Sequence, residues 1–377
     1  MRTEKTKRII LAAFLLVSCF SFDSTGQDVK TPLKYTRGES LTVSGRPPFT
    51  RPGHFHRIDS LDFTNLPQGV KNSSSHSAGL NIIFKTDSRC IGVKWNLRKY
   101  NTRANMTPIA VNGLDLYGWN GRSWQFVTSA APVPGSENNT ATLINNLDGE
   151  MRHYRVYLPL YAELTGIEIG VTEGSAIAPA DPEYLPVKKV VIYGSSITQG
   201  ASASRPGMAY PSVISRRLNV ETFNLGFSGA AKMEIEMAGI MAKIPADSYI
   251  LDCVPNTSPA QLVERALPFI RKLRQLRPDT PILMVESIFR EHGNWDHAVG
   301  ARVRQQNKSF KDVYEQLVSE NFKQIYYLSA DKLTGSDHEA TIDGTHLTDL
   351  GQVRMARQIK PKISAILQLP ACTRSGF

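Results

Sequence analysis

Four short segments of the chain carry side chains that could together perform acyl transfer. In chain order they are Gly194–Gly200, Asn224–Gly229, Asp252–Asn256 and Asp343–Leu347. Ser196 in the first segment stands at a predicted strand-to-helix turn, which would expose its hydroxyl and let its own N–H stabilise an oxyanion. No Gly-Lys-Ser/Thr follows, which disfavours a phosphate-binding loop. We therefore predict Ser196 as a nucleophile, although a serine-rich helix cap would look the same in isolation.

The other three segments supply partners for such a nucleophile. Gly229 would let a backbone N–H approach a substrate closely, and Asn256 could direct its side-chain amide at a developing negative charge. Asp343 precedes His346 by three residues, so its carboxylate could orient the imidazole and stabilise its cation. Each segment alone is an ordinary turn signal. In the order Ser, Asp, His they predict an acyl-transfer site that needs neither a metal nor a cofactor.

The elements expected to position these segments alternate along residues 185–369. Predicted strands cover 188–193, 222–225, 248–254, 281–285 and 324–328, and predicted helices cover 209–218, 233–244, 259–276, 301–321 and 350–367. This alternation predicts a three-layer, flavodoxin-like α/β domain with a parallel sheet between helices. Ligands bind at the carboxyl ends of such strands, where the first three chemical segments fall.

Residues 27–180 have a different character. Short apolar runs rich in β-branched and aromatic residues are separated by Asn, Gly, Ser and Pro clusters; the runs cover 80–84, 91–95, 109–111, 124–127, 153–158 and 164–171. The pattern is typical of an antiparallel β-sandwich. A Gly/Ala/Pro-rich stretch at 173–186 is predicted to connect this domain to the α/β domain.

The four chemical segments resemble the four sequence blocks of the SGNH/GDSL hydrolase superfamily, over about residues 187–369. The resemblance implies a serine esterase in which the N–H groups of Ser196 and Gly229 and the Asn256 side chain form the oxyanion hole. Asp343 and His346 match its Asp-x-x-His block.

Two positions depart from the family pattern. Ser195 stands where an aspartate is usual, and Val254–Thr257 replaces Gly-x-Asn-Asp. Neither change removes a proposed catalytic group, but both weaken the analogy with the commonest lipases of the superfamily.

A second resemblance lies in the first domain. Gly113–Tyr117 reads Gly-Leu-Asp-Leu-Tyr and is similar to the Gly-x-Asp-Leu-Tyr signature of a jelly-roll-like β-domain. That domain precedes a subset of these esterases, common in glycan-degrading bacteria of the Bacteroidetes type. We interpret the motif as a strand-end turn in which Asp115 caps backbone amides. The resemblance implies a carbohydrate esterase that removes acetyl groups from plant or algal polysaccharides.

Two other functions remain open. A lipase or thioesterase could use the same residues on longer acyl chains, although no long apolar lid or acyl channel is evident. A non-catalytic glycan-binding surface protein could retain the fold, but a decayed site should have lost at least one of the expected residues. No sequence pattern predicts nucleic-acid binding.

Four further residues are candidates for substrate contact. His292 and Trp295 follow the fourth predicted strand, and Arg205 and Arg290 could meet an acidic sugar. No metal site is predicted. Apart from the proposed base His346, the histidines lack neighbours that would make them metal ligands; they are His54, His56, His76, His153, His292, His297 and His338.

The start of the chain predicts export. Charged residues 2–8 precede an apolar run at 9–17, which is too short to span a membrane and suits a signal peptide within residues 1–26. Residues 16–19 resemble a bacterial lipobox that would place a lipid on Cys19, whereas residues 24–26 offer an ordinary cleavage site. The destination would be the periplasm, the outer membrane as a lipoprotein, or the medium.

Composition adds few constraints on partners. The 377 residues carry a formal net charge of +10, scattered along the chain, so a mildly basic surface could attract acidic polymers. The remaining cysteines, Cys90, Cys253 and Cys372, share no metal-ligand spacing and do not support a disulfide framework. No pattern in the sequence indicates an oligomeric state.

Overall fold

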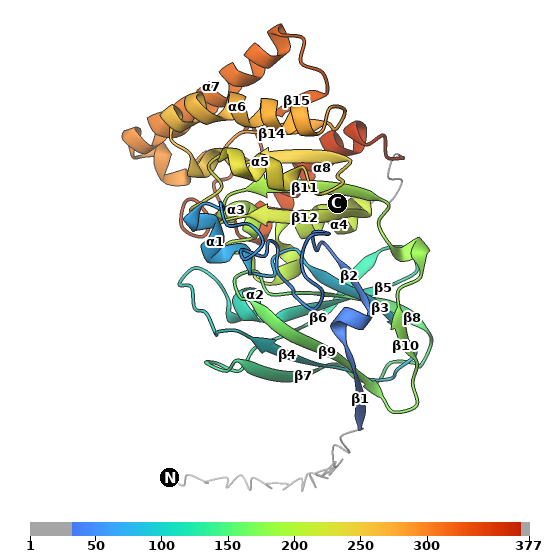
Figure 1. Ribbon diagram of the computed structural model, residues 1–377. Coiled ribbons are helices and arrows are strands. Elements are labelled where there is room, and N and C mark those ends of the chain that lie inside the picture. Colours follow the sequence, from blue (N-terminus) through green and yellow to red (C-terminus); the bar gives the residue numbers. More distant parts are fainter. Residues whose placement is uncertain (1–31, 371–377) are drawn as a thin grey trace, which may run out of the picture. The chain divides into compact units, whose positions relative to one another are not determined.

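The computed structural model describes residues 32–370, and Figure 1 shows antiparallel strands in the first half and alternating strands and helices in the second. The predicted signal peptide, Cys19 and Cys372 lie outside the described residues. Among residues 32–370, every helix is too short or too polar to cross a membrane.

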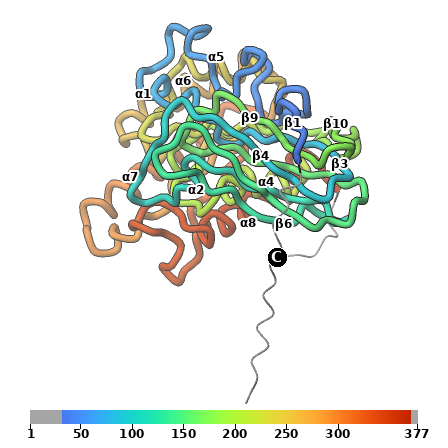
Figure 2. Tube along the Cα trace, turned by 90° about the horizontal axis from the view of Figure 1, so that it is seen from below, coloured from blue at the N-terminus to red at the C-terminus, as the bar shows by residue number. Residues whose placement is uncertain are grey.

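The N-terminal half forms the predicted β-sandwich. One antiparallel sheet has the order β1 (Leu33–Arg37), β9 (Leu164–Thr172), β4 (Ile91–Leu97) and β7 (Asn138–Ile144). The other has the order β10 (Ile177–Pro179), β3 (Asn81–Thr86), β8 (Arg152–Tyr157), β5 (Leu114–Trp119) and β6 (Trp124–Ala130), with β2 (Thr42–Ser44) also on β3. Figure 2 shows β1, β9 and β4 side by side. Alternate side chains such as Ile82, Val93 and Val156 fill the space between the sheets.

Two predictions inside this domain were wrong. Residues 109–111 form helix α2 (Pro108–Asn112), because Thr107 Oγ1 accepts a hydrogen bond from Ala110 N at 3.0 Å and Pro108 fits the first turn. These start signals outweigh a short β-branched run. The Gly-Leu-Asp-Leu-Tyr motif is not a strand-end turn, because residues 114–117 lie in β5, which pairs with both β6 and β8. Helix α1 (Gln68–Ser74) precedes β3 in this half of the chain.

The C-terminal half contains one parallel sheet. Its order is β12 (Val220–Gly226), β11 (Lys188–Gly194), β13 (Ser248–Asp252), β14 (Ile282–Val285) and β15 (Ile325–Leu328). Both faces of β11 are apolar: Val190 and Ile192 face one helix layer, and Val191 and Tyr193 face the other. The first layer holds α4 (Tyr210–Leu218) and α8 (Asp349–Ile366); the second holds α5 (Ile235–Met241), α6 (Pro259–Leu276) and α7 (His297–Ser319).

The strand order places a switch point at β11. The chain goes from β11 to its neighbour β12 and then to β13 on the opposite side of β11, so the carboxyl ends of β11 and β13 open a crevice. The short helices α3 (Ser196–Gln199) and η4 (Val254–Asn256) follow these two strand ends. The predicted three-layer α/β fold is therefore confirmed, and it puts the serine segment at the expected edge.

The predicted connector contributes structure of its own. Within 173–186, β10 pairs with β3, and η2 (Pro182–Tyr184) follows Asp181. Asp181 accepts a hydrogen bond from Lys85 at 2.6 Å and contacts His153 at 3.1 Å. This stretch is thus held against the sandwich by strand pairing and by charge.

Candidate active site

The turn after β11 presents the predicted nucleophile. Ser195 Oγ accepts a hydrogen bond from Ile197 N at 3.2 Å and so caps α3, leaving Ser196 as the first helical residue. A Cβ at Gly194 would lie 2.0 Å from Thr198 Oγ1 and 2.7 Å from the Asp252 carbonyl, so only glycine fits where the strand turns into the helix. Ser196 is largely buried at this turn, with 8% of the residue exposed.

Three predicted side chains meet at this turn. Ser196 Oγ lies 3.0 Å from His346 Nε2, and His346 Nδ1 lies 2.7 Å from Asp343 Oδ2. The other carboxylate oxygen of Asp343 accepts the N–H of Thr345 at 3.0 Å and that of His346 at 2.8 Å. The carboxylate therefore fixes both the backbone and the ring of the histidine, with Nδ1–H donating and Nε2 left to accept from the serine.

The charge of Asp343 is strongly favoured in this setting. Partial burial raises its pKa, but the hydrogen bonds from the backbone and ring of His346, the charge of that ring and the N–H of Thr345 together outweigh burial and lower the pKa to about 2. The carboxylate is consequently ionised over the whole pH range in which most proteins stay folded. It can therefore stabilise an imidazolium.

Asn105 joins this group from the β-sandwich and was missed by the sequence analysis. Its Nδ2 donates to Asp343 Oδ2 at 3.1 Å and lies 3.3 Å from His346 Nδ1. No local motif marks the residue, because 238 positions separate it from its carboxylate partner. The first domain thus contacts the histidine–aspartate pair directly.

Two backbone N–H groups near the serine are free to bind an anion. Among residues 32–370, neither Ser196 N nor Gly229 N donates to another protein group. Gly229 has a φ of +69°, a conformation that L side chains rarely adopt. The turn that carries Gly229 is held by Gln199, whose Oε1 accepts Ser228 N at 3.0 Å. This geometry suits a preformed pair of oxyanion donors.

Asn256 lies beside the same turn but is engaged in holding it. Its Nδ2 donates to Phe227 O at 3.2 Å and to Ala230 O. Both amide hydrogens therefore have acceptors, and one of these bonds must be exchanged before Asn256 can serve an oxyanion.

A buried carboxylate holds the start of helix α3, which carries Ser196. Asp252 ends β13; its carbonyl accepts Ser195 N at 3.2 Å, and its Oδ2 accepts the hydroxyls of Thr198 at 2.7 Å and Tyr210 at 2.9 Å. Burial raises the pKa of Asp252 to about 7, although the bonds from Thr198 and Tyr210 oppose the shift. Asp252 belongs to a segment singled out in the sequence, but its anchoring role was not predicted.

Comparison with known proteins agrees with this geometry. Residues 187–364 match the GDSL-like lipase/acylhydrolase family, and residues 33–177 match the N-terminal domain of SGNH-hydrolase-type esterases. A GDSL-like lipase from Bacteroides ovatus is 40% identical, with a TM-score of 0.85 and coverage of 90% of this chain and 99% of that one. The chain belongs to the GDSL-like lipase/acylhydrolase family. It is a carboxylic ester hydrolase with the N-terminal domain that carries the Gly-x-Asp-Leu-Tyr signature.

Two more distant structures share the fold of this hydrolase. A salicylyl-acyltransferase from a tetracycline biosynthetic pathway is 18% identical, with a TM-score of 0.73 over 90% of this chain and 98% of that one. A family two carbohydrate esterase from Cellvibrio japonicus is 13% identical, with a TM-score of 0.59 over 90% and 99%. A search of curated proteins finds no match.

The signature motif of the hydrolase joins its two halves. Asp115, fully buried in β5, accepts hydrogen bonds from Arg205 Nη1 at 2.7 Å and from Gly207 N at 2.9 Å. Arg205 also donates to Tyr117 OH at 2.5 Å and lies over the ring of Phe126. Asp115 does cap a backbone amide, as predicted. The charge of Arg205 is neutralised inside the protein, which argues against the predicted contact with an acidic sugar.

A second buried arginine of the hydrolase ties the sandwich to β12. Arg57 is 1% exposed and donates to the carbonyls of Ser73, His76, Asn224 and Gly226. Burial lowers its pKa to about 9. Because Gly226 precedes the turn that carries Gly229, Arg57 fixes the strand end beside the candidate oxyanion hole. Nothing in the local sequence distinguishes Arg57 from a surface arginine.

The remaining substrate candidates lie around η5 (Glu291–Asn294). A Cβ on Gly344, in the loop of Asp343 and His346, would lie 2.8 Å from His292 Nδ1, so His292 borders that loop. Trp295 follows η5 and is 87% exposed. Arg290 Nη2 donates to Pro255 O at 3.0 Å, next to Asn256, and burial and the nearby Arg302 lower its pKa.

Proposed function

We propose that the protein hydrolyses short-chain acyl esters, acetyl esters foremost, on carbohydrate, through an acyl-enzyme on Ser196. The observation that carries the proposal is the chain of contacts from Ser196 Oγ to His346 Nε2 at 3.0 Å and from His346 Nδ1 to Asp343 at 2.7 Å. The runner-up functions, a lipase or thioesterase for longer chains and a non-catalytic glycan-binding protein, differ from it in measurable ways.

The proposed reaction has two halves. His346 takes the proton of Ser196 as its oxygen attacks the ester carbonyl, and the imidazolium then gives that proton to the departing alcohol. Water repeats the sequence: His346 removes a proton from water, hydroxide attacks the acyl-enzyme, and the proton returns to Ser196 as the acid leaves. Asp343 keeps the ring in the required tautomer and stabilises its cation in both halves.

The tetrahedral oxyanion of each half needs donors. The N–H groups of Ser196 and Gly229 are proposed as two of them, and Asn256 as a third once one of its bonds to the turn is exchanged. Loss of one such donor typically lowers turnover by about 10²–10³-fold.

The preference for carbohydrate rests on two supports. The Cellvibrio structure with the same fold is a carbohydrate esterase. In addition, Trp295 exposes 87% of its surface directly after η5, whose His292 borders the loop of Asp343 and His346. Aromatic side chains of this kind are enriched at binding interfaces. We propose that Trp295 and His292 contact the sugar, and that Arg290 contacts an acidic one.

The test is a series of nitrophenyl esters of increasing chain length, followed by mass spectrometry of acetylated polysaccharides. We expect the highest kcat/KM on nitrophenyl acetate. In the mass spectra of the glycan we expect losses that each correspond to one acetyl group. Ser196→Ala should abolish both, while the exposed Ser319→Ala, at the end of α7, should not. Preference for long chains would establish the lipase reading, and glycan binding without hydrolysis would establish the non-catalytic one.

The role of Trp295 can be separated from the chemistry. Trp295→Ala is expected to raise KM for acetylated glycan and to leave nitrophenyl acetate hydrolysis unchanged, because the small ester does not reach the ring. Leu61→Ala removes a side chain of similar exposure elsewhere, 72%, and serves as the control.

Export is also proposed, from residues 1–26 and the possible lipid on Cys19. Cell fractionation of the producing bacterium and of a Cys19→Ser variant tests it. A lipid anchor predicts that the wild type is in the membrane fraction and the variant is not; a cytoplasmic protein would contradict export.

A further inference from the structure

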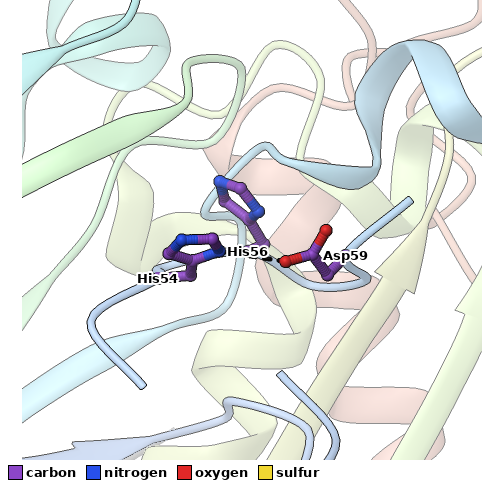
Figure 3. A group of neighbouring side chains, drawn as sticks. All are labelled: His54, His56 and Asp59. Atoms are coloured by element: carbon purple, nitrogen blue, oxygen red, sulfur yellow. Dashed lines mark hydrogen bonds and ion pairs between the residues drawn. The ribbon is translucent and has the colours of Figure 1, made fainter. Parts of the chain in front are cut away.

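A group of side chains outside the active site has the composition of a metal site. The loop between β2 and α1 carries His54, His56 and Asp59, and the potential ligand atoms of all three lie within 4.8 Å of one another. Figure 3 shows the three side chains turned toward one another. The sequence alone did not predict this group, because its His-x-His-x-x-Asp spacing lies in no predicted element.

Asp59 is the most buried residue of the group. Its side chain is only 4% exposed, its Oδ1 accepts Leu61 N at 3.2 Å, and its Oδ2 lies 3.0 Å from His54 Nδ1. The rings of His54 and His56 have centroids 4.7 Å apart and are tilted by 45° rather than stacked. One carboxylate oxygen is therefore held by the loop, and the other faces the imidazole side of the cluster.

His56 has an outer partner of the kind that metal-bound histidines use. Its Nε2 lies 3.4 Å from Glu163 Oε1, and Glu163 also accepts from Arg98 Nε at 3.2 Å. A proton on Nε2, facing this carboxylate, would leave the lone pair of Nδ1 on the other side of the ring, which is the arrangement that a metal ligand needs.

The charged side chains around the group balance one another. Arg51 donates through Nη2 and Nε to the two oxygens of Asp62, at 2.6 and 3.1 Å, and lies farther from Asp59, with Nε 3.6 Å from Oδ2. Arg46 Nη1 also donates to His54 O at 3.5 Å. Arg46, Arg51 and Arg98 thus match the three carboxylates of Asp59, Asp62 and Glu163, so the surroundings carry no net positive charge against a cation when the histidines are neutral.

We propose that His54, His56 and Asp59 bind one divalent transition-metal ion of the zinc class. Two imidazole nitrogens and one carboxylate oxygen form a donor set that suits Zn²⁺ and its neighbours and does not suit Mg²⁺ or Ca²⁺, which prefer oxygen alone. Metal bonds of about 2.0–2.2 Å require only that the ligand atoms move toward a common centre. Three protein ligands leave a position for water.

Bound metal would order a loop that matters to the hydrolase. Arg57 follows His56 directly and places its guanidinium on the carbonyls of Asn224 and Gly226. The ion would hold the segment that carries this arginine. The ion would act at a distance from Ser196 and take no part in ester cleavage. The metal proposal and the esterase proposal can therefore be tested independently.

The test uses purified, tag-free protein stripped of metal with a chelator. Zn²⁺ is titrated by calorimetry, and the thermal unfolding midpoint is measured with and without the ion. We expect saturable binding of one Zn²⁺ per chain, a higher midpoint with the ion, and visible absorption from Co²⁺ in the same site. Mg²⁺ and Ca²⁺ should not compete.

Three variants and one control decide the outcome. His54→Gln changes a ligand that is 41% exposed and should abolish binding without unfolding the protein; His56→Gln should do the same, and Glu163→Gln should weaken binding by about 10–100-fold. His338→Gln, an exposed histidine paired with Glu291, should bind as the wild type does. Absence of saturable binding to the wild type, or unchanged binding in folded His54→Gln and His56→Gln, would overturn the proposal.

Discussion

The reactivity proposed for Ser196 depends on side chains that act through one another. His346 can accept the serine proton only if its Nδ1 carries the other proton, and Asp343 enforces that tautomer through a contact of 2.7 Å. Because the pKa of Asp343 is lowered to about 2, acid does not remove this control until far below neutral pH. Each residue can therefore be tested by a change that spares its shape.

Asp343→Asn is expected to lower kcat for nitrophenyl acetate by about 10³–10⁴-fold with little change in KM, because the amide favours the wrong tautomer of the ring. Steady-state kinetics with circular dichroism as the folding check measure the effect. Wild-type turnover in a folded variant would show that the carboxylate has no part in the chemistry.

Asn105→Ala is expected to lower kcat by about tenfold, because Asp343 loses a hydrogen bond to a charged oxygen and the imidazole is held less firmly. The KM for a small ester and the unfolding midpoint should stay close to the wild type. Asn138→Ala, on the exposed edge strand β7, is the matched control. A lower midpoint with unchanged kcat would mean that Asn105 only stabilises its own loop.

Among the elements, the strands and helices of the α/β layers could be predicted from the sequence. Helix α6 begins and ends where the periodicity predicts, at Pro259 and Leu276, and each strand of the parallel sheet matches a predicted apolar run. Such elements are encoded locally, by apolar side chains at regular spacing. Helix α2 and strand β5 were assigned wrongly because capping and sheet pairing outweighed a short local pattern.

The residues of the candidate site also differ in whether the local sequence predicts them. The segments with Ser196, Gly229 and His346 could be singled out because each forms a local motif. Asn105 and Arg57 could not, because their roles depend on partners 238 and 169 positions away. Side chains that act across domains leave no trace in the local sequence.

The buried carboxylate of Asp252, at the end of β13, predicts a specific pH dependence of the free energy of unfolding. The pKa of Asp252 rises from 3.8 to about 7 on folding, so between these values the folded state binds more protons than the unfolded state. Stability from this group is then greatest below about pH 4 and declines as the pH rises to about 7. Asp252→Asn should flatten that part of the curve, measured by urea unfolding from pH 4 to 8. An unchanged slope would contradict the shifted pKa.

Both domains contribute residues to the candidate active site. The sandwich supplies Asn105 to the histidine–aspartate pair, and Tyr161 donates its hydroxyl to Ser196 O at 3.4 Å. The junction is held by the buried ion pair of Asp115 and Arg205. The β-domain therefore contacts the turn of the proposed nucleophile as well as packing beside the α/β domain.

Asp115→Asn tests the junction. The change leaves the Arg205 guanidinium without its buried counter-charge, so we expect unfolding to be easier by about 3–5 kcal/mol, measured in urea. Asp148→Asn, in an exposed pair with Arg152, should change stability little. If both variants were equally stable, the signature motif would not hold the domains together.

Covalent trapping of the nucleophile tests the role proposed for Ser196 most directly. A fluorophosphonate is incubated with the wild type, with Ser195→Ala and with His346→Ala, and the labelled peptide is identified by mass spectrometry. We predict one label per chain on Ser196 in the wild type, retention of that label in Ser195→Ala, and its loss or marked slowing in His346→Ala. A label on another residue, or none on folded, active protein, would contradict the mechanism.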